Sequence, residues 1–375
     1  MMRRKAFIAV FLFLVAAPLV AFVFGYEMKS TDRRSLASRP ALSIEGLEDR
    51  SFFSLYEGYF NDHFPVRAAL IKAKAIIDFR VLGVSPAPSL HIGKDGWLYL
   101  KKDLVDFMKN SCADKEAMTR LAQDLRALED VVEASGRRFL FFVAPNKMTI
   151  YPEYAGVEPF PTCGKSRLDL LKEAFREFPL RNQIMADELL LDAKKSRQVY
   201  KKNDSHWSYN GSKLVSDETL KRIAPGLVLF PPRIVDGVVV YTGGDLSDMT
   251  MTRLTETLQE LKIDGYPYGT RVEKMPPLKY AGWVPLKITV EDAPPEAVLV
   301  PRAIFFADSF MYLPLKFMQG AFERIDVVWS KTIPVPERAE ELKAARIVVV
   351  EAVERDLGEL KIDVEAVKEM LSSPQ

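Results

Sequence analysis

Histidine and cysteine are scarce in this chain, and neither sign of charge is in excess. Its 375 residues include three histidines and two cysteines, and no histidine has a cysteine or a second histidine at the spacing of a zinc site. Lysine and arginine total 52 and aspartate and glutamate total 51, so no overall field attracts nucleic acid. The sequence also lacks internal repeats and low-complexity tracts. We therefore predict no metal ion, no cofactor and no nucleic acid partner, and infer function from local motifs.

The first feature that is present is a charge-free run of 20 residues, 6–25, after the basic start "MMRRK". About 20 apolar residues cross a bilayer, whereas the core of a secretory signal peptide has about 7 to 15. No small-residue cleavage pattern ends the run, which favours an uncleaved signal anchor over residues 1–26 rather than a cleaved signal peptide. Because the basic residues stay in the cytoplasm, the rest of the chain is expected outside it.

Residues 27–88 are predicted to form a tether followed by juxtamembrane helices. The stretch 27–45 is polar and has no periodicity. Aromatic and aliphatic residues then recur at helical spacing on both sides of Pro65, which interrupts a helix. A larger domain, 89–375, is expected to follow.

In this larger domain, short apolar runs alternate with helical patterns. The runs are "RFLFFVAP", "AIFFADSF", "RIDVVWS" and "ARIVVVEAV". Their alternation with helices predicts an α/β fold, in which a parallel sheet has helices on both faces. Frequent prolines and antiparallel strand patterns between residues 225 and 298 predict a small β-rich inserted lobe. The charged stretch 353–371 is expected to be a solvated final helix.

The two cysteines, Cys112 and Cys163, form an even pair in a domain expected outside the cytoplasm. Disulfides persist in such compartments. The pair is expected either to be a disulfide or to be two separate buried thiols.

The run "AIFFADSF" contains a candidate nucleophile, Ser309. In open α/β sheets the active residues follow the carboxyl ends of the strands. Asp308 would cap the next helix, and Ser309 would meet free backbone N–H groups that favour an oxyanion. An ordinary capping Asp-Ser pair is the alternative.

A candidate base, His206, lies in the polar loop "KNDSHWSYNG", two residues after Asp204. Histidine is the usual proton carrier near neutral pH, and an aspartate fixes its tautomer and stabilises its charged form. Side chains at positions i and i+2 of an extended loop point the same way. Together with Ser309, this pair supplies the three roles of a serine triad.

Further residues are weaker candidates for substrate binding or for an oxyanion hole. They are Asn146 and Lys147 after the strand "FFVAP", Trp207 beside His206, Gly244 in "TGGDL", and Asp308 before the serine. The alternatives are a loop with a solvated lysine, a core tryptophan that supports the imidazole, and a plain glycine turn.

From about residue 57 to the C-terminus, the chain resembles the SGNH-hydrolase-like alginate O-acetyltransferases of the AlgJ and AlgX type. The motifs that carry the resemblance are, in order, "EGYFNDHFPVR", "IGKDGWLYL", "VAPNKMTIYPEY", "NDSHWSYNG", "GGDL" and "FFADSF". The layout, with an N-terminal anchor and no sugar-binding module after the catalytic fold, is similar to AlgJ. The resemblance implies Ser309 as nucleophile, His206 as base and Asp204 as orienting acid. Where this family usually has glycine before Asp-Ser, the chain has Ala307, and Ser208 and Tyr209 replace its common Thr-Pro.

The resemblance implies an acyltransferase that moves acetyl groups to hydroxyls of an exported polysaccharide, alginate-like or cellulose-like, through an acyl-serine. It also implies a membrane-bound O-acyltransferase as donor partner, a polysaccharide synthesis and export complex, and a single-pass protein of the inner membrane with its catalytic domain in the periplasm. Two alternatives remain. One is a polysaccharide acetylesterase with the same triad, and the other is a catalytically silent scaffold of the export complex, a role that Ala307 in place of glycine would fit.

Overall fold

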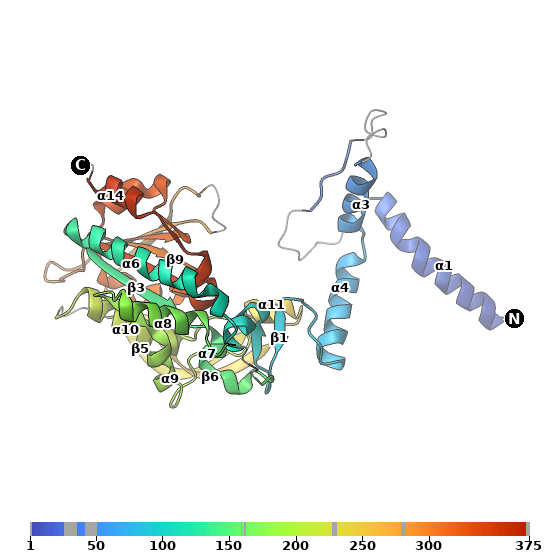
Figure 1. The fold of residues 1–375 in the computed structure, drawn as a ribbon. Helices are drawn as coiled ribbons and strands as arrows, with labels where there is room; N and C mark the ends of the chain where they lie inside the picture. Colours follow the sequence, from blue (N-terminus) through green and yellow to red (C-terminus); the bar gives the residue numbers. More distant parts are fainter. Residues whose placement is uncertain are drawn as a thin grey trace. The chain divides into compact units, whose positions relative to one another are not determined.

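The computed structural model describes residues 2–25, 36–41, 51–158, 160, 163–226, 231–278 and 283–372. The chain divides into two compact units, Met1–Ala87 and Pro88–Gln375 (Figure 1).

The N-terminal unit begins with a long apolar helix, α1 (Met2–Val23). Its 20 residues Arg4–Val23 have a mean hydropathy of 2.8, long and apolar enough to cross a membrane. Pro18 lies inside the helix. This helix matches the predicted charge-free run.

Two more helices of this unit lie on either side of Pro65, where the sequence predicts a break. They are α3 (Phe52–His63) and α4 (Arg67–Ile76), and α4 continues into a π-helical turn, Ile77–Val81. Most of the predicted tether, 27–45, lies outside the described residues.

A seven-stranded sheet forms the centre of the second unit, in the order β4-β3-β12-β9-β10-β8-β7. The first five of these strands are parallel, and β8 and β7 add antiparallel strands at one edge. Their bounds are β3 Arg138–Ala144, β4 Gln183–Met185, β7 Thr270–Lys274, β8 Leu286–Val290, β9 Ala303–Ala307, β10 Arg324–Trp329 and β12 Ile347–Val353. The carboxyl ends of β3, β12 and β9 therefore meet at one edge of the sheet.

Helices cover both faces of the sheet, and each face has its own apolar core. The central strands β3, β12 and β9 are almost continuously apolar, as expected for strands that are buried on both faces. One core contains side chains of α6 (Lys115–Ala134), α8 (Arg167–Glu177), α13 (Ala339–Ala344) and α14 (Val364–Ser372). The other contains side chains of α7 (Lys147–Ile150), α9 (Ala186–Ala193), α10 (Tyr209–Ile223) and α12 (Tyr312–Met318). The predicted sheet with helices on both faces is thus confirmed, as a mixed sheet.

Three small two-stranded sheets and two short helices complete the strands and α-helices described in this unit, which also contains short 3-10 segments. The sheets are β1 (Leu90–Ile92) with β2 (Leu98–Leu100), β5 (Arg233–Thr242) with β6 (Thr255–Gly265), and β11 (Thr332–Ile333) with β13 (Lys361–Ile362); the helices are α5 (Leu104–Phe107) and α11 (Asp245–Met249).

The predicted inserted lobe, 225–298, is not confirmed. Its first two strands, β5 and β6, do pair as a hairpin. Its last two, β7 and β8, instead extend the central sheet, because β8 pairs with β10. The segment contributes to the same compact unit as the rest of Pro88–Gln375.

The expectation of one solvated final helix over 353–371 is wrong. The stretch forms a 3-10 segment (Glu354–Glu359), strand β13 and then α14. Glu354 at its start is completely buried, so this segment contributes to the interior.

Cys112 and Cys163 form a disulfide in the structure. The backbone carbonyl of Lys109 and the backbone N–H of Cys112 lie 3.3 and 3.2 Å from the sulfur of Cys163. The bridge ties the segment before α6 to the segment before α8.

We expect alkylation of the denatured, unreduced protein to label neither cysteine. Because a bridge of sequence separation 51 restricts the unfolded chain, changing both cysteines to serine should lower the free energy of unfolding by up to about 4 kcal/mol. Labelling of both thiols in the unreduced protein would exclude the bridge.

Candidate active site

Ser309 lies just beyond the carboxyl end of β9, where the chain turns into helix. Asp308 precedes it and caps the 3-10 turn Ser309–Met311, which leads into α12. The Asp308 carboxylate accepts hydrogen bonds from the backbone N–H of Phe310 and of Val353, each at 2.8 Å. These two bonds fix the exit of the strand and so the position of Ser309.

Ala307 stands where the family that the chain resembles usually has glycine, and it fits this position without strain. It is the last residue of β9, is buried, and pairs with Trp329 of β10. Extended backbone is accessible to any L-residue. The substitution therefore gives no structural reason for an inactive site.

His206 joins Ser309 and Asp204 into one hydrogen-bonded chain. Its Nε2 lies 2.8 Å from Ser309 Oγ, and its Nδ1 lies 2.7 Å from Asp204 Oδ1. Asp204 Oδ1 also accepts the backbone N–H of His206 at 2.9 Å. With the ring proton on Nδ1, Nε2 is free to accept the hydroxyl proton of Ser309.

The environment keeps Asp204 ionised. Burial acts to raise its pKa, but the hydrogen bond and charge of His206, together with the charge of Lys201, outweigh burial and hold the pKa of Asp204 well below its usual range. An ionised carboxylate beside the imidazole stabilises the imidazolium that forms during proton transfer.

Trp207 supports the site from within the core. Its indole is completely buried, and Nε1 donates to the carbonyl of Phe310 at 3.0 Å. The Phe310 ring packs against both His206 (centroids 4.8 Å apart) and Trp207 (5.1 Å). Because its ring faces are covered, Trp207 is not placed to stack on a sugar; it holds the loop of the base against the turn of the nucleophile.

Lys147 is buried beneath the His206 loop rather than at the mouth of the site. Its Nζ donates to three backbone carbonyls, those of Lys201 (3.1 Å), Lys202 (3.0 Å) and Asp204 (2.8 Å). Burial lowers the pKa of Lys147 to about 8, although the negative charges of Asp245 and Asp204 act to raise it. The structure thus makes Lys147 a support of the loop that carries the triad acid and base.

Gly244 brings a second loop close to the triad. It has a positive φ of 121°, and a Cβ there would lie 2.5 Å from the carbonyl oxygen of Asn203. Only glycine therefore allows this approach. Its role is this close contact, and no hydrogen bond from its N–H into the site is present among the described residues.

Asp245, the residue after Gly244, is a site residue that sequence reasoning missed. Its carboxylate accepts the backbone N–H of Ser205 at 2.7 Å and the Ser205 hydroxyl, and one oxygen lies 3.8 Å from His206 Nδ1. The motif "GGDL" contains it, but only the fold shows that the aspartate faces the histidine loop.

A layer of buried acids lies beneath the site, and sequence reasoning missed it too. Glu351 of β12 accepts the backbone N–H of Asp308 at 2.9 Å. Burial and the charge of Asp308 raise the pKa of Glu351 well above its usual range, and burial also raises the pKa of Asp308. Because two adjacent buried carboxylates do not both ionise easily, Glu351 is the one expected to keep a proton near neutral pH.

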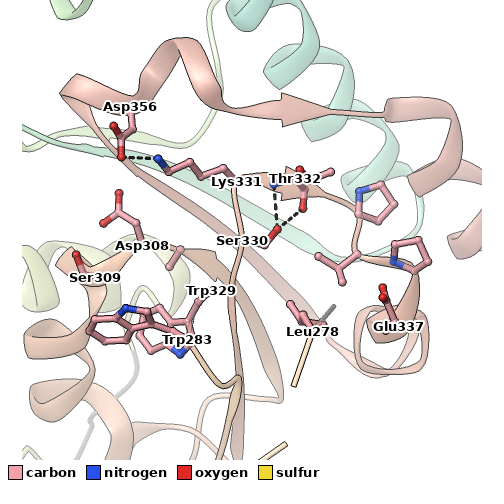
Figure 2. A pocket seen from close by; sticks show the side chains of 14 residues that line it. Leu278, Trp283, Asp308, Ser309, Trp329, Ser330, Lys331, Thr332, Glu337 and Asp356 are labelled. Carbon is pink, nitrogen blue, oxygen red and sulfur yellow. Dashed lines mark hydrogen bonds and ion pairs between the residues drawn. The ribbon is translucent and has the colours of Figure 1, made fainter. Parts of the chain in front are cut away.

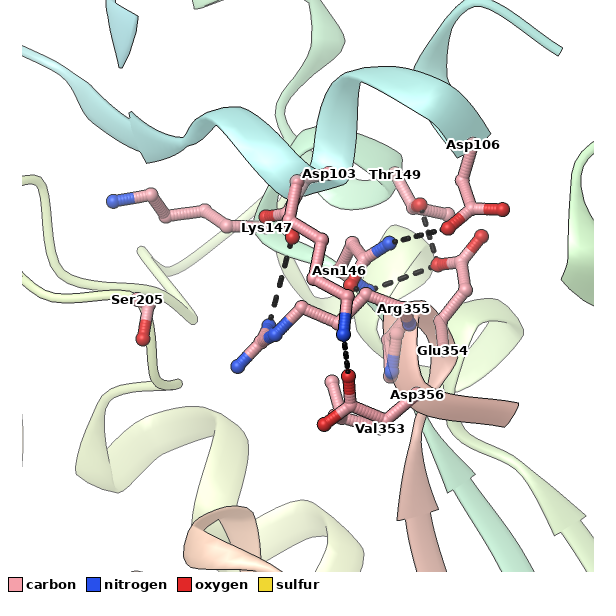
Figure 3. Close-up of polar contacts among 12 residues, drawn as sticks. Asp103, Asp106, Asn146, Lys147, Thr149, Ser205, Val353, Glu354, Arg355 and Asp356 are labelled. Carbon is pink, nitrogen blue, oxygen red and sulfur yellow. Dashed lines mark hydrogen bonds and ion pairs between the residues drawn. The ribbon is translucent and has the colours of Figure 1, made fainter. Parts of the chain in front are cut away.

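Asn146 belongs to this layer and not to the substrate surface, because it is completely buried. Figure 3 shows it between two acids: its Nδ2 donates to Asp106 at 3.3 Å, and its backbone N–H donates to Glu354 at 2.9 Å. Nearby, Asp103 faces Arg355 at 3.7 Å, and burial raises the pKa of Asp103 to about 6.

We expect Glu354→Gln to remove a pH dependence of stability. Burial, then the charge of Asp106, raises the pKa of Glu354 from 4.5 to about 8. A raised folded-state pKa contributes stability that is complete below the unfolded value and is lost as pH rises toward the folded value. Between about pH 5 and pH 8, the free energy of unfolding of the wild type should therefore fall relative to the variant, by at least about 1 kcal/mol.

Denaturant unfolding of both proteins at a series of pH values measures this difference. The glutamine oxygen can still accept from Asn146 and Thr149, as Glu354 does, so the comparison isolates the charge. Parallel curves for the two proteins across this pH range would contradict the assignment of Glu354 as a buried, protonated acid.

Asp204, His206 and Asp245 offer possible metal ligands within 4.8 Å of one another. However, His206 Nε2 faces Ser309, and Nδ1 already contacts Asp204. Asp245 accepts two hydrogen bonds from Ser205. These contacts use the same atoms that would bind an ion, so the arrangement favours hydrogen-bonded proton transfer.

A cavity of 590 Å³ opens beside Ser309 (Figure 2). Such a volume is typical of ligand-binding sites. The residues that line it come from the loops after β9 and β10, from the 3-10 segment after β12, and from the region before β8: Leu278, Trp283, Ala307, Asp308, Ser309, Trp329, Ser330, Lys331, Thr332, Pro334, Val335, Pro336, Glu337 and Asp356. A substrate in this cavity would have direct access to the candidate nucleophile.

Known proteins match parts of the chain. Residues 90–249 match the family model described as the SGNH hydrolase-like domain, acetyltransferase AlgX. The probable alginate O-acetylase AlgJ of Pseudomonas syringae is 26% identical over 171 residues, which are 45% of this chain and 41% of that protein. AlgJ of Pseudomonas aeruginosa is 25% identical over 193 residues, 51% of this chain and 46% of that protein. The chain thus matches less than half of the length of these curated relatives.

A solved structure, the O-acetyltransferase domain of Pseudomonas putida AlgJ, has the same fold. It superposes with a TM-score of 0.50 at 17% identity, covering 77% of this chain and all of that one. The large unit therefore has an SGNH hydrolase-like α/β fold. Within it, residues 90–249 are similar to the acetyltransferase domain of the AlgX type. That segment contains Asp204, His206 and Asp245, whereas Ser309 lies beyond it.

Proposed function

We propose that this protein transfers acetyl groups to hydroxyls of an exported polysaccharide, through an acetyl-serine formed on Ser309. The observation that carries the proposal is the chain of contacts from Ser309 Oγ through His206 to Asp204, at 2.8 and 2.7 Å. The acetyl group and the polysaccharide are supported by the names of its relatives, which are called alginate O-acetylases.

In the first half of the reaction, Ser309 Oγ attacks the carbonyl carbon of the acetyl donor while His206 Nε2 takes the hydroxyl proton. We assign the backbone N–H of Ser309 as the donor to the negative charge that develops on the carbonyl oxygen, because the N–H groups of Phe310 and Met311 already donate to Asp308. When the intermediate collapses, the donor's leaving group takes the proton from His206, and the acetyl group stays on Ser309.

In the second half, a sugar hydroxyl in the cavity attacks the acetyl carbon. His206 Nε2 accepts the hydroxyl proton and passes it to Ser309 Oγ as the serine leaves. Asp204 keeps the ring oriented and stabilises its charge in both halves. The product is an acetylated sugar, and the enzyme returns to its starting state.

An acetylesterase would use the same triad with water as acceptor, so the products must be compared. We expect the full-length protein, given an acetyl ester and a polysaccharide, to place acetyl groups on the polymer, as measured by mass spectrometry of its fragments. Release of free acetate alone, with no acetylated sugar at any polymer concentration, would favour the esterase.

We further propose that residues 1–26 are an uncleaved anchor in the inner membrane, 27–88 a tether with juxtamembrane helices, and 89–375 a periplasmic catalytic domain. The support is the apolar length of α1 and the basic residues before it. A membrane-bound O-acyltransferase as acetyl donor and a polysaccharide synthesis and export complex are the partners that this arrangement suits.

Protease added to intact spheroplasts is expected to digest the domain, because it would lie outside the cytoplasmic membrane. A cytoplasmic protein in the same cells, protected until detergent is added, is the control. Protection of the domain, or a mature chain that begins beyond Gly25, would contradict the anchor.

A further inference from the structure

Among the described residues that line it, the cavity beside Ser309 offers no unpaired positive charge. Lys331 is the one lysine or arginine among the described residues that line it. Its Nζ pairs with Asp356 at 2.6 Å and with Glu359 at 2.7 Å. Lys102 pairs with the other oxygens of the same two acids, at 2.6 and 2.5 Å. Two lysines and two carboxylates thus neutralise one another (Figure 2 shows the pair Lys331 and Asp356).

The remaining charged groups of the lining are acidic. They are Glu337, which is exposed, and Asp308, whose oxygens already accept two backbone N–H groups. A ligand that carried a carboxylate on each unit would meet these acids, and no free cation among the described lining residues would bind it. Like charges placed together across an interface disfavour the wrong partner.

The cavity also has an aromatic wall suited to uncharged rings. Trp283 is 51% exposed and packs edge-on against Trp329, with ring centroids 5.4 Å apart. Trp329 is fixed by a hydrogen bond from its Nε1 to the carbonyl of Val284 at 3.1 Å. In Figure 2 both indoles lie on the side of the cavity near Ser309. An exposed indole offers a large flat surface on which the C–H face of a sugar ring can stack.

We propose that this cavity is the acceptor subsite and that it takes an uncharged polysaccharide, built of neutral sugars, in preference to a polyuronate such as alginate. The inference rests on the proposed function, since it names the acceptor of that reaction. A ring stacked on Trp283 places its hydroxyls at the side of the cavity that contains Ser309.

Binding can be measured apart from catalysis in the full-length Ser309→Ala protein in detergent. Calorimetric titration with hexasaccharides of glucose, mannose or galactose, and with a mannuronate hexasaccharide, compares the two classes at about 0.15 M salt, where weak surface charges are screened. We expect at least one neutral hexasaccharide to bind about 10-fold tighter than the uronate. Equal or tighter binding of the uronate, or no binding of any neutral hexasaccharide, would overturn the proposal.

Variants at two positions, made in the same Ser309→Ala protein, test the two causes of this preference. Trp283→Ala should weaken binding of the neutral hexasaccharide about 10-fold, whereas Trp283→Phe, which keeps a ring face, should weaken it less. Glu337→Lys should improve binding of the uronate at least about 5-fold, because it replaces a repulsive charge by an attractive one. Unchanged neutral binding in Trp283→Ala would refute the aromatic subsite, and unchanged uronate binding in Glu337→Lys would refute the charge argument.

The outcomes also separate this inference from the proposed function. If neutral hexasaccharides bind as expected but the wild type transfers no acetyl group to them or to the uronate, the proposed function fails while the subsite remains. If only the uronate becomes acetylated, the proposed function holds and the acceptor inference is wrong.

Discussion

Replacing Ser309 with alanine is expected to lower the rate of acetyl transfer by a factor of at least about 10³, because no other group can form the acyl intermediate. His206→Ala should cause a similar loss, since a serine hydroxyl is a weak nucleophile until a base removes its proton. The two residues act as a unit, so the double variant should be little worse than either single one. Initial rates with an activated acetyl ester measure all three.

A serine in the His206 loop, Ser205, provides the control for Ser309. Ser205 donates its hydroxyl to Asp245 and lies 3.5 Å from His206 Nδ1, so Ser205→Ala should reduce the rate much less than Ser309→Ala does. Circular dichroism and the melting temperature check that each variant is folded. If the Ser309→Ala protein kept the wild-type rate, Ser309 would not be the nucleophile, and Asp308 and Ser309 would be an ordinary helix cap.

The same variant separates an enzyme from a scaffold. If the protein only holds an export complex together, Ser309→Ala should leave polymer acetylation in cells unchanged. Loss of acetylation with normal assembly of the complex would instead show that the serine is needed for chemistry.

The second large effect is expected for Asp204→Asn, which should lower the rate by about 10² to 10⁴. Asparagine has almost the same shape, but it cannot stabilise the imidazolium and can favour the wrong tautomer of His206. Asp245→Asn is the matched control at the same histidine. The Asp245 carboxylate lies 3.8 Å from His206 Nδ1, whereas that of Asp204 lies 2.7 Å away. Because Asp245 also accepts hydrogen bonds from Ser205, we expect Asp245→Asn to lower the rate less.

A pH series of the rate distinguishes the two aspartates further. Because the pKa of Asp204 is held well below its usual range, its charge is present throughout the pH range in which the enzyme works, and Asp204→Asn should lower the rate at every pH of that range. A rate loss in Asp245→Asn as large as that in Asp204→Asn across the series would assign the orienting role to Asp245 instead.

Much of this site could be predicted from short-range pattern. The strand that leads to Ser309 is a continuous apolar run, and the turn after it contains a capping aspartate, so both features lie within eight residues of sequence, 302–309. The spacing of Asp204 and His206 likewise places two side chains on one side of a loop. That these two segments meet is a property of the fold, since 103 residues separate His206 from Ser309.

The residues that sequence reasoning missed depend on distant pairing. Asp245 faces the histidine loop only because Gly244 allows a backbone approach to Asn203. The charged stretch after β12 has the composition of a surface helix. Glu354 in this stretch is nevertheless buried, and it accepts the backbone N–H of Asn146 in the loop after β3. In the same way, β7 and β8 have the local pattern of a separate lobe, and only the pairing of β8 with β10 joins them to the central sheet.

The most direct test of the account is to trap the acyl group. The full-length protein is mixed briefly with an acetyl donor, quenched in acid and digested, and its peptides are examined by mass spectrometry. We predict one added acetyl group on the peptide that contains "FFADSF", located on Ser309, and its absence in Ser309→Ala and in His206→Ala. An acetyl group trapped on a different residue, with none on Ser309 while the enzyme turns over, would contradict the mechanism.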